Sequence, residues 1–399
     1  MSASACPVII ASVVAAMVAS ALSAEPSLKP APASAPTNHL ETMPASLAAE
    51  VSTAHPTLRE AAGGRWLVGA AVTSEQLRNP KTAALVAAQF NSLTGEFEFF
   101  PQFLHPEPEK FTFDRADRVA SFAAEHHLPL CGHMLCWAQF TPAWMFATAD
   151  GKPLRREQAL TNLKNHIDAV ITHFKGNVHA WNVVNEALSD AAGAYLRDTP
   201  ARRAIGDDYI ARAFEYAHAA DPAAMLYYND YNIEEASKLQ KTIKLVHSLR
   251  DEGLRVDAVG IQGHWLLDSP DVKVIDAALT TLGREKIKVL ITELDVDVLP
   301  REESGADLAH IHGQGNNPYP RGLPPQVADA EARRYADLFK VFKAHSDVIS
   351  SITFWGVDDR QSWLNGYPVN GRTNYPLLFD RDLRSKPAFQ SVIEVLGGE

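Results

Sequence analysis

Two short strings that end in carboxylates carry the clearest chemical signal in the chain: Trp181-Asn-Val-Val-Asn-Glu186-Ala187 and Ile291-Thr-Glu293-Leu-Asp295. Each is rich in β-branched residues, which is typical of a buried strand, and each is followed by a loop and a helix-like segment. An ionised carboxylate is costly to bury, so stability alone does not explain Glu186 and Glu293. Cleavage of a glycosidic bond uses two opposed carboxylates, one as acid/base and one as nucleophile or base. The pair therefore predicts this chemistry.

The segments around these strings alternate regularly between strand-like and amphipathic patterns. The strand-like runs are Trp66–Val72, Phe90–Glu98, Leu128–Trp137, Val178–Glu186, Met225–Asn232, Ala258–Trp265, Lys288–Val296 and Ser351–Asp358. The amphipathic segments between them include Asp114–Glu125, Gln158–Phe174, Ala201–Ala219, Glu234–Glu252 and Val327–His345. Eight such repeats predict an α/β fold, a (β/α)8 TIM barrel that forms a single catalytic domain over residues 56–399. An open doubly wound sheet is the alternative, but no Gly-rich phosphate loop follows the first strand.

A barrel places its functional residues at the carboxyl ends of its strands, and polar and aromatic residues gather there in this sequence. They are His133, Trp137, Asn185, Glu186, Asn229, Tyr231, Gln262, His264, Glu293, Asp295, Trp355 and Trp363. Residues two apart on a strand share a face, so Gln262 pairs with His264, Glu293 with Asp295, and Asn229 with Tyr231. Asn185 and Glu186 are adjacent, and a twist or bulge at the strand end would let both reach the barrel mouth.

Composition excludes several classes of protein. The 399 residues have 46% hydrophobic and 21% charged side chains, as in a soluble globular protein. The net charge of −11 argues against a nucleic-acid partner and gives no basic patch for a membrane surface. We expect a monomer that acts on a neutral polymer and uses no cofactor.

The N-terminal segment differs from the rest of the chain. An Ala/Val-rich apolar run followed by small residues predicts a signal peptide over residues 1–24, and hence a secreted or periplasmic protein. Residues 25–55 are rich in Pro, Ala and Ser and are typical of a flexible linker. Cys131 and Cys136 lie five residues apart on one predicted strand, so their side chains point to opposite faces and we expect free thiols.

Metal binding is not expected. The cysteine spacing does not match a zinc site. His310 and His312 precede a long loop over residues 313–323, which we interpret as a solvated loop that caps one side of the site.

With these strings in sequence order, the chain resembles glycoside hydrolase family 10, the retaining endo-β-1,4-xylanases, over about residues 60–397. The matching stretches are Phe90-Asn-Ser-Leu-Thr94, Gly132-His133, Trp181 to Ala187, Tyr227-Tyr-Asn-Asp-Tyr-Asn232, Gly260-Ile-Gln-Gly-His-Trp265, Ile291 to Asp295, Thr353-Phe-Trp-Gly-Val357 and Ser362-Trp363.

The resemblance implies a role for each matched residue. Glu186 would be the acid/base and Glu293 the nucleophile, with His264 and Asp295 holding Glu293 and Asn185 contacting the sugar 2-hydroxyl. The remaining matched residues would bind substrate or support the site: Glu96, His133, Trp137, Asn229, Tyr231, Gln262, Trp355 and Trp363. The implied partner is xylan or a related β-linked oligosaccharide.

The match fails at several positions on the non-reducing side of the predicted cleft. Phe97 and Phe100 stand where the family has Asn and Lys, and Ala138 stands where it has a second His. Hydrogen-bond donors are thus replaced by apolar groups, and we expect an unusual, decorated or shortened glycone. Phe97, Phe99 and Phe100 are either core residues or a sugar-facing surface. Asn182 replaces the family's Asp, and four strand residues span roughly 13 Å, so we expect little effect on the pKa of Glu186.

Three other functions compete with hydrolysis of β-1,4-xylan. The same two glutamates could act on another β-glycoside, which the altered Phe97, Phe100 and Ala138 favour. A carbohydrate-binding protein without catalysis is opposed by the intact Glu186 and Glu293. A metal-dependent barrel hydrolase would need convergent His and Asp ligands, including an early His-x-His that the sequence lacks.

Overall fold

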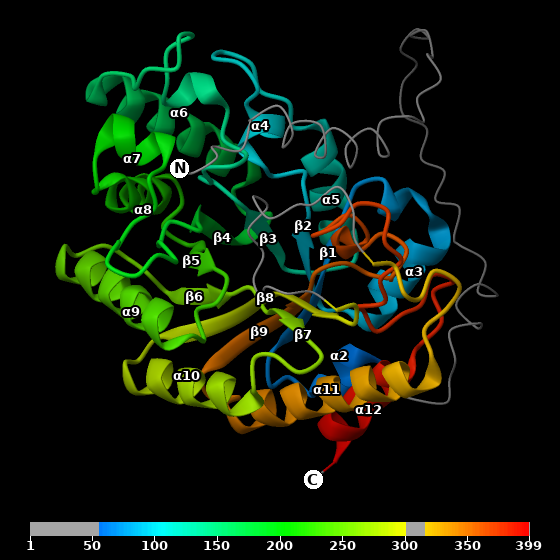
Figure 1. Ribbon diagram of the computed structural model, residues 1–399. Helices are drawn as coiled ribbons and strands as arrows, with labels where there is room; N and C mark the ends of the chain where they lie inside the picture. Colours follow the sequence, from blue (N-terminus) through cyan, green and yellow to red (C-terminus); the bar gives the residue numbers. More distant parts are fainter. Residues whose placement is uncertain (1–55, 301–315, 399) are drawn as a thin grey trace, which may run out of the picture.

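The computed structural model describes residues 56–300 and 316–398, in which parallel strands surrounded by helices form a closed barrel (Figure 1). The strands are β1 (Leu67–Val72), β2 (Ser92–Gly95), β3 (Leu130–His133), β4 (Val178–Asn185), β5 (Met225–Asp230), β6 (Ala258–Ile261), β7 (His264–Leu266), β8 (Lys288–Asp297) and β9 (Ile349–Phe354). The predicted signal peptide and linker, residues 1–55, lie outside the described residues.

Helices follow the strands along the chain and cover the outside of the barrel. They are α2 (Leu58–Ala62), α3 (Pro80–Gln89), α4 (Pro101–Leu104), α5 (Asp114–Glu125), α6 (Arg156–Phe174), α7 (Pro200–Ile205), α8 (Tyr209–Ala220), α9 (Ala236–Asp251), α10 (Val272–Arg284), α11 (Pro325–Ala344) and α12 (Pro387–Gly397). The predicted helix over Ala201–Ala219 is divided into α7 and α8 at Gly206, whose φ of 116° is incompatible with a continuous helix.

Barrel closure confirms the predicted (β/α)8 fold. The strand order is β6-β5-β4-β3-β2-β1-β9-β8-β7, and an additional parallel pairing of β6 with β8 closes the ring. The predicted strand Ala258–Trp265 is interrupted at Gly263, which has a φ of 84°. Its second part, β7, pairs with the end of β8 and places His264 opposite Asp295.

The barrel interior changes from apolar to polar along its strands. A buried apolar cluster contains Ala180, Tyr227, Ala258 and Leu290, from β4, β5, β6 and β8. Two residues further along the same strands stand Asn182, Asn229, Gly260 and Thr292, which share the inward face because strand side chains alternate. The polar layer is therefore set by sequence periodicity, and it lies toward the carboxyl ends where the two glutamates are found.

Packing on the outward face of β4 determines which of its side chains point into the barrel. Trp181 is 1% exposed and packs against Phe174 of α6 and against Phe99. A Cβ on Gly132 of β3 would lie 2.1 Å from the Trp181 ring, so only glycine leaves room for the indole. Burial of one large aromatic side chain stabilises the fold by about 3 kcal/mol, and Trp181 thereby keeps Asn182 facing inward.

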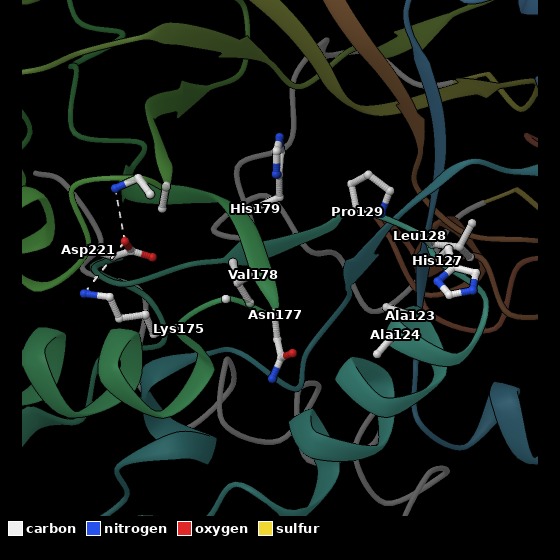
Figure 2. Close-up of a pocket in the computed structure, with 13 residues that line it drawn as sticks. Ala123, Ala124, His127, Leu128, Pro129, Lys175, Asn177, Val178, His179 and Asp221 are labelled. Carbon is white, nitrogen blue, oxygen red and sulfur yellow. Dashed lines mark hydrogen bonds and ion pairs between the residues drawn. The ribbon is translucent and has the colours of Figure 1, made fainter.

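A pocket of about 540 Å³ lies at the opposite end of the barrel (Figure 2). Its lining includes Pro129, Val178 and Ala224, which precede or begin β3, β4 and β5, so it opens at the amino ends of the strands. Cys131 and Cys136 are free thiols, as expected. No helix within the described ranges is long and apolar enough to cross a membrane.

Candidate active site

Glu186 and Asn185 reach the same site because the chain turns sharply where β4 ends. Glu186 has a φ of 54°, in the left-handed region that a non-glycine residue rarely adopts. At this turn successive side chains no longer point to opposite faces, so Asn185 and Glu186 lie together. Asn185 Nδ2 donates to Glu186 Oε1 at 3.2 Å. The peptide N–H groups of Ala187 and Leu188, which follow the turn, both donate to the hydroxyl oxygen of Tyr228 and hold it in place.

Glu186 is almost fully buried and is surrounded by hydrogen-bond donors. Gln262 Nε2 donates to Oε1 at 2.9 Å, and the Trp137 indole N–H donates to Oε2 at 3.0 Å. Burial and the nearby Asp230 carboxylate raise the pKa of Glu186 to about 7, although Arg197 and the Gln262 hydrogen bond act in the opposite direction. A carboxyl with this pKa can both give and take a proton near neutral pH.

Glu293, on β8, has the opposite electrostatic character. Burial alone would raise its pKa, but the hydrogen bond from His264, the positive charge of His264 and a hydrogen bond from Asn229 lower it below the ordinary glutamate value. His264 Nε2 lies 3.1 Å from Oε2, and Asn229 Nδ2 lies 2.7 Å from Oε1. Glu293 is therefore ionised, and both of its oxygens are oriented.

His264 acts as a charged donor because Asp295 lies on its other side. Its Nδ1 is 3.0 Å from Asp295 Oδ1, and the Trp363 indole N–H donates to Asp295 Oδ2 at 2.7 Å. Burial lowers the pKa of His264, but the Asp295 charge and hydrogen bond, together with Glu293, outweigh it and raise the pKa to about 9.

The two glutamates are connected through a pair of amides. Asn229 Nδ2 donates to Asn185 Oδ1 at 2.8 Å as well as to Glu293, and Asn185 in turn donates to Glu186. Thr292 donates its hydroxyl to Asn229 Oδ1 at 2.6 Å and fixes the orientation of that amide. A carboxyl of raised pKa beside one of lowered pKa is the combination that assigns acid and nucleophile in glycosidic bond cleavage.

Aromatic rings enclose the side of the site between His133 and His264. Trp355 meets His133 edge-on with ring centroids 5.1 Å apart, and it meets His264 at 6.3 Å. Trp363, which is partly exposed, stacks on Tyr367 at 4.5 Å. Burial lowers the pKa of His133 to about 4, so its ring is neutral at pH 7 and Nδ1 accepts from Asn182 Nδ2 at 3.2 Å.

Glu96, after β2, is a buried carboxyl of a different kind. Burial raises its pKa well above the ordinary value, and the charges of Glu98 and Glu293 act in the same direction. The protonated form of Glu96 is therefore favoured, and that form carries a hydroxyl donor.

Tyr231 lies in a charged cluster behind Glu186 and makes no hydrogen bond to either glutamate. Its hydroxyl contacts Asp190 and Arg197, and the Lys238 ammonium lies 4.4 Å from its ring centroid. Lys238 also pairs with the fully buried Asp230 at 3.0 Å. The cluster supports the Glu186 loop and places charges that act on Glu186.

The sequence did not single out Thr292, Asp230, Arg197 or Lys238 as site residues. Thr292 could have been found, because it occupies the same inward layer as Asn229, two strands away across β6. Arg197 lies in the irregular segment between β4 and α7, where no periodicity indicates which side chain turns inward. Among residues 56–300 and 316–398, no group of three His, Cys, Asp or Glu side chains could hold a metal ion; His310 and His312 lie outside these ranges.

Comparison with known proteins agrees with this geometry. The model of the family described as "Glycosyl hydrolase family 10" matches residues 57–395. "Endo-1,4-beta-xylanase B" of Paenibacillus barcinonensis is 37% identical over 343 residues, covering 86% of this chain and 99% of that protein. "Endo-1,4-beta-xylanase" of Geobacillus stearothermophilus is 38% identical over 340 residues, covering 85% and 98%.

Solved structures give the same answer. The crystal structure of xylanase XynB from Paenibacillus barcinonensis, complexed with a conduramine derivative, matches with a TM-score of 0.79 at 37% identity, over 86% of this chain and 99% of that one. An endoxylanase retrieved from a sugarcane soil metagenome matches with a TM-score of 0.79 at 34% identity, over 85% and 99%. This chain belongs to glycosyl hydrolase family 10, and it is a glycoside hydrolase.

Proposed function

We propose that the protein hydrolyses β-1,4-xylosidic bonds in xylan and xylo-oligosaccharides with retention of anomeric configuration. The observation that carries this proposal is the opposite tuning of two buried glutamates: the pKa of Glu186 is raised to about 7 and that of Glu293 is lowered. The xylanase relatives, which match over nearly their whole length, support the choice of xylan.

In the first step, ionised Glu293 attacks the anomeric carbon, while protonated Glu186 gives its proton to the leaving glycosidic oxygen. The anomeric C–O bond breaks and a glycosyl ester with Glu293 forms. In the second step, Glu186, now a carboxylate, takes a proton from water as that water attacks the anomeric carbon. The ester bond breaks, Glu293 is released as a carboxylate, and Glu186 is protonated again.

The remaining residues have positioning roles in this scheme. Protonated His264 and Asn229 hold the Glu293 carboxylate toward the anomeric carbon and stabilise its charge between turnovers. Asn185, fixed by Asn182 and Asn229, presents its amide to the sugar 2-hydroxyl. Trp355 and Trp363 line the sugar at the cleaved bond, and Glu96, His133, Trp137 and Gln262 contact substrate or orient Glu186.

The role of Glu293 as nucleophile is tested by measuring the release of reducing sugar from xylan. Glu293→Gln should lose the activity that wild type shows. Glu234→Gln is the matched control, because Glu234 is also buried and hydrogen-bonded, to the Trp265 indole, but is not part of the site. Glu186→Ala should keep measurable activity on an aryl xyloside with an acidic phenol, which leaves without a proton. Proton NMR should show the β-anomer of the product first. First appearance of the α-anomer, or full activity in Glu293→Gln, would refute the mechanism.

We further propose that residues 1–24 direct export, that residues 25–55 link them to the catalytic domain, and that the enzyme acts as a secreted or periplasmic monomer. N-terminal sequencing of the mature protein tests the cleavage, with processing after Ala21 or Ala24 expected. Cell fractionation tests the compartment, and light scattering tests the monomer. An unprocessed N-terminus would contradict the proposed export signal, and a dimer mass would contradict the proposed monomer.

A further inference from the structure

Five aromatic side chains pack, together with the buried Met134, into a cluster whose rings we call the aromatic wall: Phe97, Phe100, Phe103, Trp137 and Phe140. Phe100 lies at its centre, with ring centroids 4.8 Å from Phe140, 5.6 Å from Trp137 and 5.7 Å from Phe97. The wall is a cluster separate from the main core, whereas the neighbouring Phe99 is fully buried in that core. Sequence alone had left both interpretations open for these phenylalanines, and Phe99 differs from the other two.

The wall borders the residues proposed to cleave the bond. The Trp137 indole N–H donates to Glu186, and the Phe100 ring lies 5.8 Å from the His133 ring. His133 in turn contacts Trp355. The wall is built from the segments that follow β2 and β3, which are adjacent parallel strands, so it stands on one side of the glutamate pair.

The wall offers a sugar almost no hydrogen bonding. Of its five rings only Trp137 carries a donor, and Glu186 already accepts that hydrogen. A sugar hydroxyl held against the rings would lose water without gaining a partner, which weakens binding roughly ten-fold or more. An apolar substituent in the same place would gain affinity by leaving water.

Charge and exposed area restrict the substituent further. Phe100, Trp137 and Phe140 are 3–8% exposed, and only Phe97 and Phe103 are partly exposed, so a small group fits better than a second ring. None of the five rings of the wall carries a charge. A uronic acid carboxylate held against these rings would lose water without gaining a counter-ion from them, which favours an uncharged group.

We propose that the aromatic wall selects xylan in which a sugar on the non-reducing side of the cleaved bond carries an O-acetyl ester. The acetyl methyl group packs against Phe97, Phe100 and Phe103, and the ester removes the hydroxyl donor that the wall cannot satisfy. The ester itself is not cleaved. This inference rests on the proposed xylanase function and names its substrate class more closely.

The test compares kcat/KM for xylo-oligosaccharides that carry one acetyl group with the same material after mild alkaline deacetylation. Wild type should prefer the acetylated substrate about ten-fold or more. The double variant Phe97→Asn/Phe100→Lys supplies polar groups at the wall. In this variant the ratio of kcat/KM for the acetylated substrate to that for the deacetylated one should fall to one or below. Phe122→Asn is the matched control: Phe122 is partly buried on α5 outside the wall, and its ratio should equal that of wild type.

Two measurements keep the test decisive if the double variant folds poorly. An aryl β-xyloside carries no acetyl group, so its turnover reports whether the glutamate pair is intact. Calorimetric binding of both oligosaccharides to Glu293→Gln, which retains the wild-type wall, reports the preference without turnover. The acetyl preference would be refuted if wild type used the deacetylated substrate equally well or better, or if the double variant kept the preference. Either result would leave the proposed xylanase function intact. Preference for a feruloylated substrate would also overturn the inference, whereas failure to cleave any xylan would refute the proposed function itself.

Discussion

His264 Nδ1 lies 3.0 Å from Asp295 Oδ1, and this contact determines the charge that His264 presents to Glu293 on its other edge. Because Asp295 is the strongest influence that raises the pKa of His264, the ring is protonated at neutral pH only while that carboxylate is present. Glu293, on β8, is thereby kept as an anion inside the barrel. Asp295 therefore acts on Glu293 through His264.

Asp295→Asn should lower kcat/KM about 100-fold, a loss typical of removing one preorganised charged donor. Burial would then lower the pKa of His264, the ring would become neutral, and the pKa of Glu293 would rise. The acid limb of the pH profile should consequently move to higher pH. The control is Asp276→Asn, because Asp276 forms a similar pair with His345 at 2.7 Å on the helices outside the barrel. An acid limb at the wild-type position would contradict this role.

The pH profile of wild type should follow the two glutamates in opposite directions. Glu186 must be protonated for the first step, so kcat/KM should fall as pH rises through about 7. Glu293 must be ionised and its pKa is lowered, so activity should persist below the ordinary glutamate pKa of about 4.3 before the acid limb appears. Initial rates on xylo-oligosaccharides at pH 3–10 measure both limbs. An alkaline limb near pH 5 would show that Glu186 is not the acid.

Gln262 should control the position of the alkaline limb. Its Nε2 donates to Glu186 at 2.9 Å and thereby favours the ionised form of that carboxyl. Gln262→Leu removes this donor, so the pKa of Glu186 should rise and the alkaline limb should move above pH 7, with a lower kcat. Gln390→Leu is the control, since Gln390 makes the same 2.9 Å contact with Glu394 on α12, far from the site. A limb that moves to lower pH would be inconsistent with the assigned hydrogen bond.

The sequence predicted the barrel and the two glutamates because both depend on periodic patterns and strand ends. It could not predict contacts that arise where a strand departs from regular geometry. Asn182 was expected to be remote from Glu186 on an extended strand. β4 has an irregular register between Asn182 and Val184, and Asn182 Nδ2 lies 3.1 Å from Asn185 Oδ1, which leads to Glu186 through one amide. Asn182 therefore has an indirect route to Glu186, and its effect on the pKa is still a prediction to measure.

Tyr231 shows the corresponding error for side chains. Strand alternation placed it on the same face as Asn229, but β5 ends at Asp230, and Tyr231 turns into the charged cluster with Asp190 and Arg197. The aromatic wall differs again: Phe103 lies in the short helix α4, its other members lie in irregular segments after β2 and β3, and only the three-dimensional structure brings Phe100 against Phe140. Side-chain placement beyond the last strand residue depends on tertiary packing, which residue spacing does not encode.

Gly260 should be essential for the pair of amides, Asn185 and Asn229, that connects the two glutamates. A Cβ at this position would lie 2.2 Å from Asn229 Oδ1 and 2.8 Å from Thr292 Cγ2, so Gly260→Ala must displace the Asn229 side chain. Asn229 would then lose its hydrogen bonds to Glu293 and Asn185, and we expect kcat/KM to fall about 10- to 100-fold with a raised acid limb. Steady-state kinetics at several pH values measure this change. Gly397→Ala is the matched control, because a Cβ there meets no atom within 4 Å. Circular dichroism should show a folded barrel in both variants, with a lower Tm for Gly260→Ala alone. Wild-type kinetics in Gly260→Ala would mean that the orientation of Asn229 does not limit the reaction.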